Sequence, residues 1–290
     1  MKIIKILGGL GNQMFQYALY LALKEKYPNE ILKIDTSCFR GYPLHNGYEL
    51  KRIFGIDSEE ATFWDKLKIA YPYSHYRSWQ IFKRVLPKRE TMIVEKNNEE
   101  FENRVFTKEK SCYYDGYWQN ERYFKDIRDT ILKVFEPKVI NPQSAELAKK
   151  ILAKESVSIH VRKGDYVNNP IFKNICDIDY YQKAIAYIQN KTNCNYYCIF
   201  SNDIEWCRSH LSHLIPKDKV TYIDWNTGKD SYQDMYLMSC CKHNIIANSS
   251  FSWWGAWLNN NKGKIVLCPQ KWNNKQDSQF ELPNNWIKIK

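Results

Sequence analysis

Short apolar runs alternate with longer stretches of helical periodicity along this chain. The pattern predicts a buried strand over residues 2–7, a glycine-rich turn, a helix that continues through about Lys26, and a second strand over residues 31–35. A strand–turn–helix–strand beginning is typical of proteins that layer helices on a sheet. We therefore expect the α/β class from the first residues onward.

The alternation is clearest in the second half of the chain. Strands are predicted there over residues 156–161, 196–201, 220–224, 244–248 and 264–268, and helices over 180–190, 204–212, 231–242 and 252–259. Strict strand–helix alternation favours a parallel, doubly wound sheet. In such a sheet ligands bind beyond the carboxyl ends of the strands. The loops that follow the strands are therefore the places to search for chemistry.

The middle of the chain, from about residue 40 to 135, is less regular, and only residues 63–70 and 120–135 have helical spacing. Pro137 and Pro142 flank a short polar segment, which is typical of a boundary between domains. A length of 290 residues also favours two domains. We expect an N-terminal α/β domain over 1–140 and a C-terminal domain over 141–290.

The charge balance favours an anionic partner. The chain has 43 basic and 32 acidic residues, a net charge of +11, but no block of consecutive basic residues of the kind that forms a nucleic-acid-binding arm. A nucleotide ligand is therefore expected and a nucleic-acid partner is not. The aromatic content of 15% suits sugar or base recognition and equally suits a plain core.

The apolar stretches are shorter than the roughly 20 residues of a membrane span, and a glycine-rich turn replaces the apolar core of a signal peptide. The nine cysteines are scattered and odd in number, which favours reduced, buried thiols over a disulfide framework. A cytoplasmic protein is expected, with peripheral contact at a membrane surface as a further hypothesis based on its charge.

Two motifs follow predicted strands. The first is His160-Val161-Arg162-Lys163-Gly164-Asp165, which places two cations at the end of a strand. The planar guanidinium of Arg162 can donate two hydrogen bonds to a diphosphate, and Asp165 can orient this guanidinium. The alternative is an ordinary Arg–Asp pair on the surface. Asn248-Ser249-Ser250-Phe251-Ser252-Trp253-Trp254 enters a helix, whose start and hydroxyls can hold an anion. Capping by Ser250 or Ser252, followed by core tryptophans, explains part of this second motif.

Two further motifs are weaker. One is Gly8-Gly9-Leu10-Gly11-Asn12-Gln13, which is not the dinucleotide-binding fingerprint, because Met14 stands where that fingerprint requires a glycine. Its glycines permit a tight turn whose backbone lies near a ligand. A tight turn that only connects the strand to the helix is the alternative. In Ser201-Asn202-Asp203 the polar side chains can read a base or ribose, although capping of the next helix is the simpler role for Asp203.

Two segments have a spacing that is found in metal sites. Asp177-Ile178-Asp179 has the DxD spacing that holds Mn²⁺ or Mg²⁺ in some sugar transferases, but Asp179 stands just before a helix, where N-capping is the simpler role. Cys207, His210 and His213 lack a partner set for zinc and fall in a predicted helix. No metal is therefore expected.

Together these motifs resemble the bacterial α-1,2-fucosyltransferases of glycosyltransferase family 11. The matching segments occur in family order and nearly end to end: GGLGNQMFQYA at 8–18, GYWQNERYF at 116–124, HVRKGDY at 160–166, SNDIEWC at 201–207 and ANSSFSWWGAWL at 247–258. The resemblance implies a GT-B-type fold, with two Rossmann-like domains facing a cleft. The domain of 1–140 would then lie on the acceptor side, and that of 141–290 would bind GDP-fucose.

The resemblance also implies an activity, which is metal-independent, inverting transfer of L-fucose from GDP-β-L-fucose to a galactose hydroxyl of an oligosaccharide or lipid-linked glycan such as O-antigen. In this interpretation Arg162 neutralises the leaving diphosphate. Lys163 stands where the wider superfamily often has a second arginine, and it lacks the fork. The candidate catalytic residues are Arg162, Asp165 and Asn12, and the candidate donor-binding residues are His160 (beside guanosine), Arg162, Asn202, Asp203, Ser249, Ser250, Phe251, Gly11 and Gln13.

Three questions stay open at this stage. The donor can be another GDP-sugar, since donor choice rests on few contacts, and a non-catalytic carbohydrate-binding protein is a further alternative. A diphosphate site argues against the latter, because a lectin needs none. No general base is identified, since neither Asp115 nor Glu121 near the GYWQNE segment has support.

Overall fold

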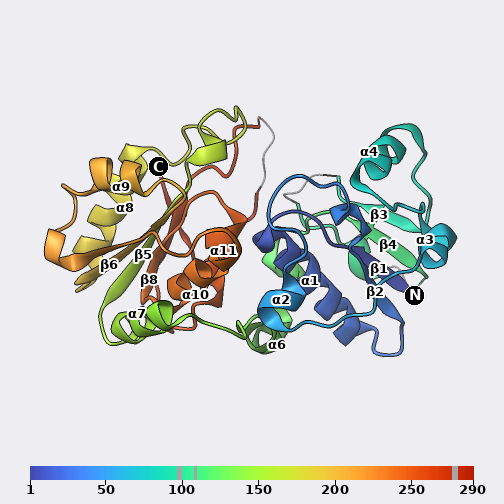
Figure 1. Ribbon diagram of the computed structural model, residues 1–290, viewed down its shortest axis with the longest axis horizontal. Helices are drawn as coiled ribbons and strands as arrows, with labels where there is room; N and C mark the ends of the chain where they lie inside the picture. Colours follow the sequence, from blue (N-terminus) through green and yellow to red (C-terminus); the bar gives the residue numbers. More distant parts are fainter. Residues whose placement is uncertain (97–99, 108–109, 276–279) are drawn as a thin grey trace. The chain divides into compact units, whose positions relative to one another are not determined.

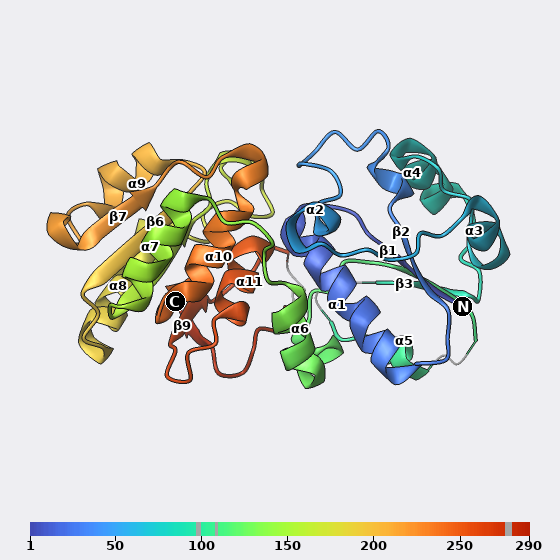
Figure 2. The same cartoon turned by 60° about the horizontal axis from the view of Figure 1, so that its bottom comes forward.

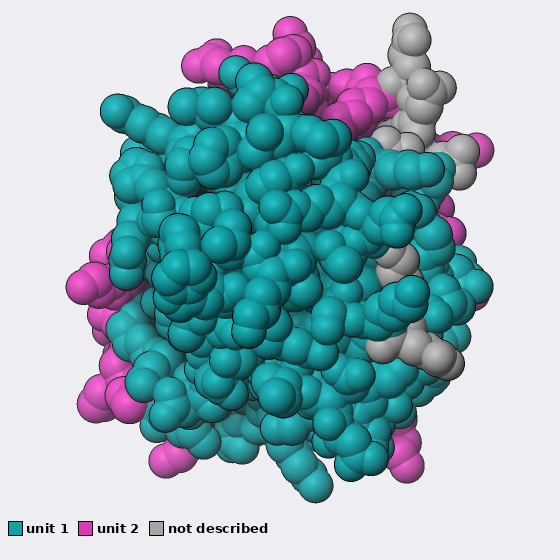
Figure 3. Space-filling model, turned by 90° about the vertical axis from the view of Figure 1, so that its right-hand side faces the viewer, with its two compact units in different colours: residues 1–138 teal, residues 139–290 magenta. Residues whose placement is uncertain are grey.

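The chain folds into two compact units, Met1–Lys138 and Val139–Lys290. The structure is a computed structural model that describes residues 1–96, 100–107, 110–275 and 280–290 (Figure 1). Figure 3 colours the two units separately. The contact boundary after Lys138 lies two residues before the division expected from the sequence at residue 140.

Unit 1, Met1–Lys138, is built on a four-stranded parallel sheet in the order β2-β1-β4-β3. Its strands are β1 (Lys2–Lys5), β2 (Leu32–Asp35), β3 (Met92–Val94) and β4 (Cys112–Asp115). Its α-helices are α1 (Leu10–Lys26), α2 (Leu50–Phe54), α3 (Phe63–Ile69), α4 (Tyr76–Val85), α5 (Arg104–Thr107) and α6 (Arg128–Val134), with short 3₁₀ turns at Ser37–Phe39, Glu121–Tyr123 and Lys125–Ile127.

The irregular middle segment contributes more to this sheet than the sequence pattern predicts. Both β3 and β4 lie in it, and β4 pairs directly with β1, with Lys2 opposite Cys112. All four residues of β4 are buried, so they show no alternation of polar and apolar positions. A run this short cannot be told from loop by periodicity alone.

Unit 2, Val139–Lys290, holds a six-stranded parallel sheet in the order β10-β9-β8-β5-β6-β7. Its strands are β5 (Ser156–Val161), β6 (Tyr196–Ser201), β7 (Val220–Ile223), β8 (His243–Ile245), β9 (Val266–Pro269) and β10 (Ile287–Ile289). Its α-helices are α7 (Pro142–Leu152), α8 (Ile178–Lys191), α9 (Ile204–Leu211), α10 (Tyr232–Cys240) and α11 (Ser250–Leu258), with 3₁₀ turns at Gly164–Tyr166, Lys217–Lys219 and Gly228–Asp230.

Helices cover both faces of this second sheet (Figure 1, Figure 2). Alternate residues of β6 belong to two cores: Tyr197 and Ile199 pack with residues of α8 and α9, whereas Cys198 and Phe200 pack with residues of α7 and α10. A strand buried on both faces reads as a continuous apolar run, and the sequence pattern located β5 and β6 to the residue for this reason.

The structure differs from the sequence pattern at three local points. Pro142 occupies the first turn of α7, a helix that the pattern missed, and Asn141 caps this helix by accepting from Ser144 N at 2.7 Å. The cap of α8 is Asp177, which accepts from Tyr180 N, and not Asp179. The strand expected over 244–248 ends at Ile245, because the chain then turns toward α11.

The strand order of unit 2 decides where its two charged and hydroxyl-bearing motifs meet. The chain passes from β5 outward to β6 and β7, then crosses back to place β8 on the other side of β5. The reversal makes a topological switch point between β5 and β8, where ligands of doubly wound sheets bind. Among the described residues no helix combines the length and apolar character that crossing a bilayer requires.

Candidate functional site

The switch point of unit 2 brings together residues that are far apart in sequence. Strands β5 and β8 run side by side in parallel, with Val157 opposite His243 and Ile159 opposite Ile245. Their carboxyl ends therefore lie at one edge of the sheet. Arg162 and Lys163 follow β5 there, and the Asn248–Ser250 segment follows β8.

Helix α11 begins at this edge. Ser249 is its cap and accepts from Phe251 N at 3.3 Å, so the expectation that Ser250 or Ser252 caps the helix is wrong. The Ser252 hydroxyl instead donates back to the Ala247 and Ser249 carbonyls, at 3.3 and 3.4 Å. The first N–H groups of a helix and the positive end of its dipole favour an anion. This arrangement leaves the half-buried Ser250 at the helix start, where its hydroxyl and backbone N–H suit a phosphate oxygen.

His160 lies at the end of β5 and is 6% exposed. Its ring centroid is 5.9 Å from that of Phe251, and its Nδ1 has no hydrogen-bond partner among the described residues. Burial, together with the nearby Arg162 charge, lowers the pKa of His160 to about 3. The imidazole is therefore neutral near pH 7. A buried ring nitrogen without a partner costs free energy, which a ligand that hydrogen-bonds to it would recover.

Arg162 is held by the loop that follows it. Its guanidinium lies 5.5 Å from the Tyr166 ring centroid, and the Tyr166 hydroxyl donates to the Asn248 carbonyl at 3.3 Å. Tyr166 also stacks on Phe172, with centroids 4.7 Å apart. Tyr166 thus ties the loop after β5 to the loop after β8 and supports the arginine between them. Tyr166 belongs to the HVRKGDY segment, but its role depends on Asn248, which lies 82 positions away along the chain.

Asp165 lies in the 3₁₀ turn Gly164–Tyr166, but its side chain lies outside the described part of the structure. The predicted pairing of Asp165 with Arg162 stays a prediction.

Lys163 is directed away from Arg162 by its own contacts. Its ammonium lies 3.9 Å from the Trp206 ring centroid and 3.5 Å from the Cys176 carbonyl. Burial lowers its pKa. These contacts anchor the loop to α9 and to the segment before α8. The ammonium packed on Trp206 agrees with the weaker role that the sequence analysis gave to this position.

Asn202 supports the same loop from β6. Its Oδ1 accepts from Lys163 N at 3.0 Å. Its Nδ2 lies 2.1 Å from the position that a Cβ atom on Gly164 would take, so a side chain there would collide with Asn202. Gly164 also has φ +37°, so only glycine fits easily there. Asp203 caps α9 by accepting from Trp206 N at 3.0 Å, the simpler of the two roles considered.

The structure groups no three potential metal ligands among the residues that it describes. In the DxD segment Asp177 is the cap of α8 and Asp179 pairs with Lys183 at 2.6 Å. Cys207 is buried in α9, and the His210 ring stacks on Trp206 with centroids 4.5 Å apart. All nine cysteines are free thiols.

In unit 1 the Gly8–Gln13 turn is held mainly by side-chain amides. Gln13 is fully buried, donates to the Gly8 and Gly47 carbonyls at 2.9 and 2.8 Å, and accepts from Glu49 N at 2.9 Å. These contacts give Gln13 a structural role, and its predicted contact with a donor gains no support from them. Gly11 is buried in the first turn of α1. Asn12 accepts from Gln119 at 2.6 Å.

The base considered at Asp115 is a buried structural carboxylate. Asp115 is 4% exposed, pairs with the buried Lys5 and accepts from Trp79 Nε1 at 2.8 Å. Burial alone would raise its pKa, but the Lys5 ammonium and the Trp79 hydrogen bond keep it lowered. A carboxylate that is held ionised in this way is a weak proton acceptor.

The sequence model for glycosyl transferase family 11 matches residues 73–290. The α-1,2-colitosyltransferase of Escherichia coli is 36% identical to this chain over 295 residues, covering 99% of the chain and 98% of that protein. The O-antigen biosynthesis glycosyltransferase WbnK of Escherichia coli is 32% identical over 308 residues, covering 97% and 98%.

The crystal structure of the α-1,6-fucosyltransferase NodZ soaked with GDP-fucose is similar in fold, with a TM-score of 0.51 at 15% identity, covering 89% of this chain and 91% of that one. The likeness extends over both units. Together with the two parallel sheets, it confirms the expected fold class.

Proposed function

The chain belongs to glycosyl transferase family 11 and is a glycosyltransferase, and from that premise we propose that it moves L-fucose from GDP-β-L-fucose onto a galactose hydroxyl of a glycan. Transfer would proceed with inversion, form an α-1,2 linkage and need no metal. In this proposal unit 2 binds the nucleotide sugar, and unit 1 lies on the acceptor side.

The observation that carries the proposal is the switch point of unit 2. It combines an arginine fork, the start of α11 and an unpaired, neutral imidazole at one sheet edge. The arginine and the helix start suit a diphosphate, and the imidazole suits a neutral group such as a nucleoside. Ser249 and Asn202 stabilise the loops through hydrogen bonds to backbone N–H groups. The residues that would contact the ligand are Ser250, Phe251 and His160.

The mechanism follows from where charge develops. As the bond between fucose and the diphosphate breaks, negative charge grows on the leaving phosphate. A fixed guanidinium that interacts more strongly with this state than with the bound donor lowers the barrier. We assign this role to Arg162, because its guanidinium lies beside the Tyr166 ring and Tyr166 ties the loop after β5 to the loop after β8.

A comparison of donor sugars tests the proposal most directly, because the 36% identical relative is named a colitosyltransferase. Colitose differs from fucose by a single missing hydroxyl group. A site that hydrogen-bonds this hydroxyl in fucose would discriminate strongly against the sugar that lacks it, while an apolar site would not. The name of the colitosyltransferase supports the α-1,2 linkage, and the name of WbnK supports an O-antigen acceptor.

A lipid-linked acceptor would bring the enzyme to a membrane surface. The net charge of +11 would favour contact with anionic lipid headgroups. Sedimentation with anionic vesicles that disappears at high salt would support such contact, and sedimentation that is indifferent to salt would contradict an electrostatic origin.

The test of the proposal is GDP release in the presence of a galactoside acceptor, with GDP-fucose, GDP-colitose or GDP-mannose as the donor and with EDTA present throughout. The variants are Arg162→Ala and, as a matched control, Arg208→Ala. Arg208 lies on α9 of the same unit and pairs with Asp224 at 3.3 Å on the surface.

We expect turnover with GDP-fucose that survives EDTA, falls on the order of 100- to 1,000-fold in Arg162→Ala, and is unchanged in Arg208→Ala. Faster turnover with GDP-colitose would correct the donor sugar and leave the reaction class intact. Activity abolished by EDTA would refute the metal-independent mechanism.

A further inference from the structure

Unit 1 has a topological switch point of its own. From β1 the chain first forms β2 on one side, and later returns to place β4 on the other side of β1, with β3 outside it. The loops after β1 and β4 therefore lie side by side at the carboxyl edge of the sheet. The first loop begins at Gly8 and the second at Gly116. By the same rule that applies to unit 2, this edge is a ligand-binding position.

The two loops are built together. The Gln16 side chain accepts from Leu7 N and donates to the Gly116 carbonyl, both at 2.9 Å, and so joins the end of β1 to the loop after β4. The Glu95 carboxylate accepts from the backbone N–H groups of Tyr117 and Trp118 at 2.6 and 3.0 Å. Gln119 is therefore presented from a restrained loop.

A pair of amides spans the switch point. Gln119 Nε2 donates to Asn12 Oδ1 at 2.6 Å, and both residues are half-buried. Within the described residues, the remaining amide groups, Asn12 Nδ2 and Gln119 Oε1, make no hydrogen bond. The pair thus offers one donor and one acceptor side by side, which is what two neighbouring hydroxyl groups of a sugar require.

Aromatic rings flank the glycine backbone of the same turn. A Cβ at Gly8 would lie 2.9 Å from Asn12 Nδ2 and 3.3 Å from the Tyr117 ring, and a Cβ at Gly9 would lie 3.2 Å from the His45 ring. Gly8 also has φ +100°, which disfavours other residues. The glycines therefore let Asn12 and the Tyr117 and His45 rings pack directly against the backbone of the turn, so that amide and rings gather at this edge.

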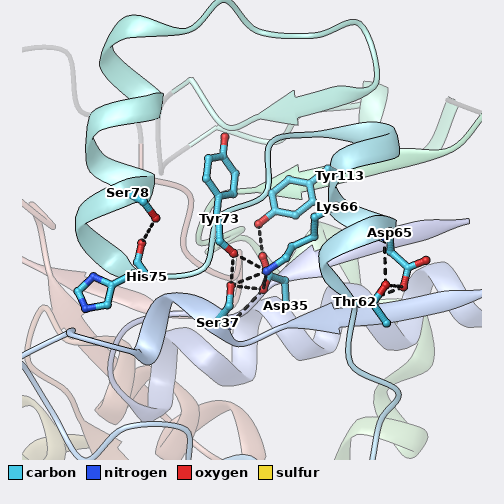
Figure 4. A network of polar contacts seen from close by, with 9 residues as sticks. All are labelled: Asp35, Ser37, Thr62, Asp65, Lys66, Tyr73, His75, Ser78 and Tyr113. Carbon is cyan, nitrogen blue, oxygen red and sulfur yellow. Dashed lines mark hydrogen bonds and ion pairs between the residues drawn. The ribbon is translucent and has the colours of Figure 1, made fainter.

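The buried cations near this edge are neutralised within the fold. Lys5 pairs with Asp115. Lys66 pairs with Asp35 at 3.1 Å, and its ammonium also contacts Ser37 Oγ at 2.7 Å and the Tyr73 carbonyl (Figure 4). The Tyr113 hydroxyl donates to Asp35 at 2.7 Å. Both lysines are less than 5% exposed. Because both ammonium groups are buried and paired with carboxylates, neither is exposed at this edge to bind a diphosphate.

We propose that the switch point of unit 1 binds an uncharged sugar unit, the one that carries the accepting hydroxyl. Asn12 and Gln119 hydrogen-bond to its hydroxyl groups, and Tyr117 packs on its apolar face. The inference rests on the proposed glycosyl transfer, and it changes the role of Asn12 from a catalytic group to a residue that binds the acceptor.

The first experiment is a kinetic comparison of Gln119→Ala with Gln143→Ala, an exposed glutamine on α7 of unit 2. We expect Gln119→Ala to raise the acceptor KM about tenfold, the effect of losing a hydrogen bond, and to leave the donor KM and the slow hydrolysis of the donor unchanged. Gln143→Ala should match the wild type. An unchanged acceptor KM in Gln119→Ala, or a raised donor KM, would overturn the inference.

Gln119→Glu tests the charge of the ligand. A carboxylate still accepts from a sugar hydroxyl, so the acceptor KM should change less than in Gln119→Ala. If a diphosphate lay here instead, like-charge repulsion would raise the donor KM well beyond its value in Gln119→Ala, and the sugar assignment would fail.

A binding measurement separates this inference from the identity of the donor. Saturation-transfer NMR with methyl β-galactoside and GDP needs no turnover. We expect galactoside signals with the wild type and with Arg162→Ala, and clearly weaker signals with Gln119→Ala at the same galactoside concentration. No signal with the wild type, or equal signals with Gln119→Ala, would overturn the sugar site. Failure of GDP-fucose as a donor would leave this result standing.

Discussion

The two sheets of this glycosyltransferase end in switch points that follow one topological rule and carry different chemistry. In unit 2 the edge between β5 and β8 holds the Arg162 guanidinium, the start of α11 and the buried, neutral His160. In unit 1 the edge between β1 and β4 holds amides and rings, while Lys5 is paired with Asp115 inside the core.

The difference shows that a basic residue near the carboxyl end of a strand does not by that position alone form an anion-binding site. Lys5 and Arg162 both stand near the carboxyl end of the first strand of their sheet. One charge is neutralised at short range by a buried carboxylate, and the other is supported by the Tyr166 ring. In the two proposals made above, the same fold element therefore serves a neutral ligand in unit 1 and an anion in unit 2.

The largest effect should come from breaking the buried pair of unit 1. Lys5→Met leaves Asp115 as an uncompensated buried carboxylate, which costs about 3–5 kcal/mol of unfolding free energy. Urea unfolding measures it. The double variant Lys5→Met/Asp115→Leu should recover most of the loss. Lys51→Met, which removes an exposed pair with Asp57, should leave stability nearly unchanged. A Lys5→Met protein as stable as the wild type would show that the pair is not structural.

The next largest effect should come from replacing the Arg162 guanidinium at the switch point of unit 2. Arg162→Lys keeps the charge but loses the planar pair of donors, and we expect a loss of about 1.5–3 kcal/mol of transition-state stabilisation, roughly 10- to 100-fold in kcat/KM. The stability of the fold should hardly change, because lysine keeps a positive charge beside the Tyr166 ring. A variant with full activity would mean that charge alone suffices at this position.

The smallest effect is the pH dependence due to His160. Its pKa is about 3 in the folded protein and about 6.5 when unfolded, so the unfolded state takes up a proton first as the pH falls. Stability due to this group is therefore lost as the pH falls below about 6.5. From pH 7.5 to 5.0 the wild type should lose about 2 kcal/mol more than His160→Gln. Equal losses in urea unfolding would contradict a buried neutral imidazole.

Sequence reasoning located the elements of unit 2 well and those of unit 1 less well. The strands over 156–161 and 196–201 were predicted to the residue, because both are buried on two faces and bounded by polar segments. Strands β3 and β4 were missed, because three or four buried residues carry no period. Ser249 caps α11 one residue before Ser250 and three before Ser252, the two expected caps, and Asp177 caps α8 two residues before Asp179.

The motifs themselves were visible in the sequence, since each follows a strand and contains residues that are unusual there. The sequence also determined the class of the fold and, through the matching segments, the family. It could not assign Tyr166 or Gln119 a function, because their roles depend on Asn248 and Asn12, which lie 82 and 107 positions away along the chain.

The strand order was decided only by tertiary structure. It places β8 beside β5 and β4 beside β1, and so determines which loops meet at each switch point. Long-range packing also pairs Lys5 with Asp115 and lays Lys163 on Trp206. Local sequence fixes which side chains follow a strand, but whether a charge is neutralised or offered to a ligand depends on burial and on neighbours that only the folded chain brings within a few ångströms.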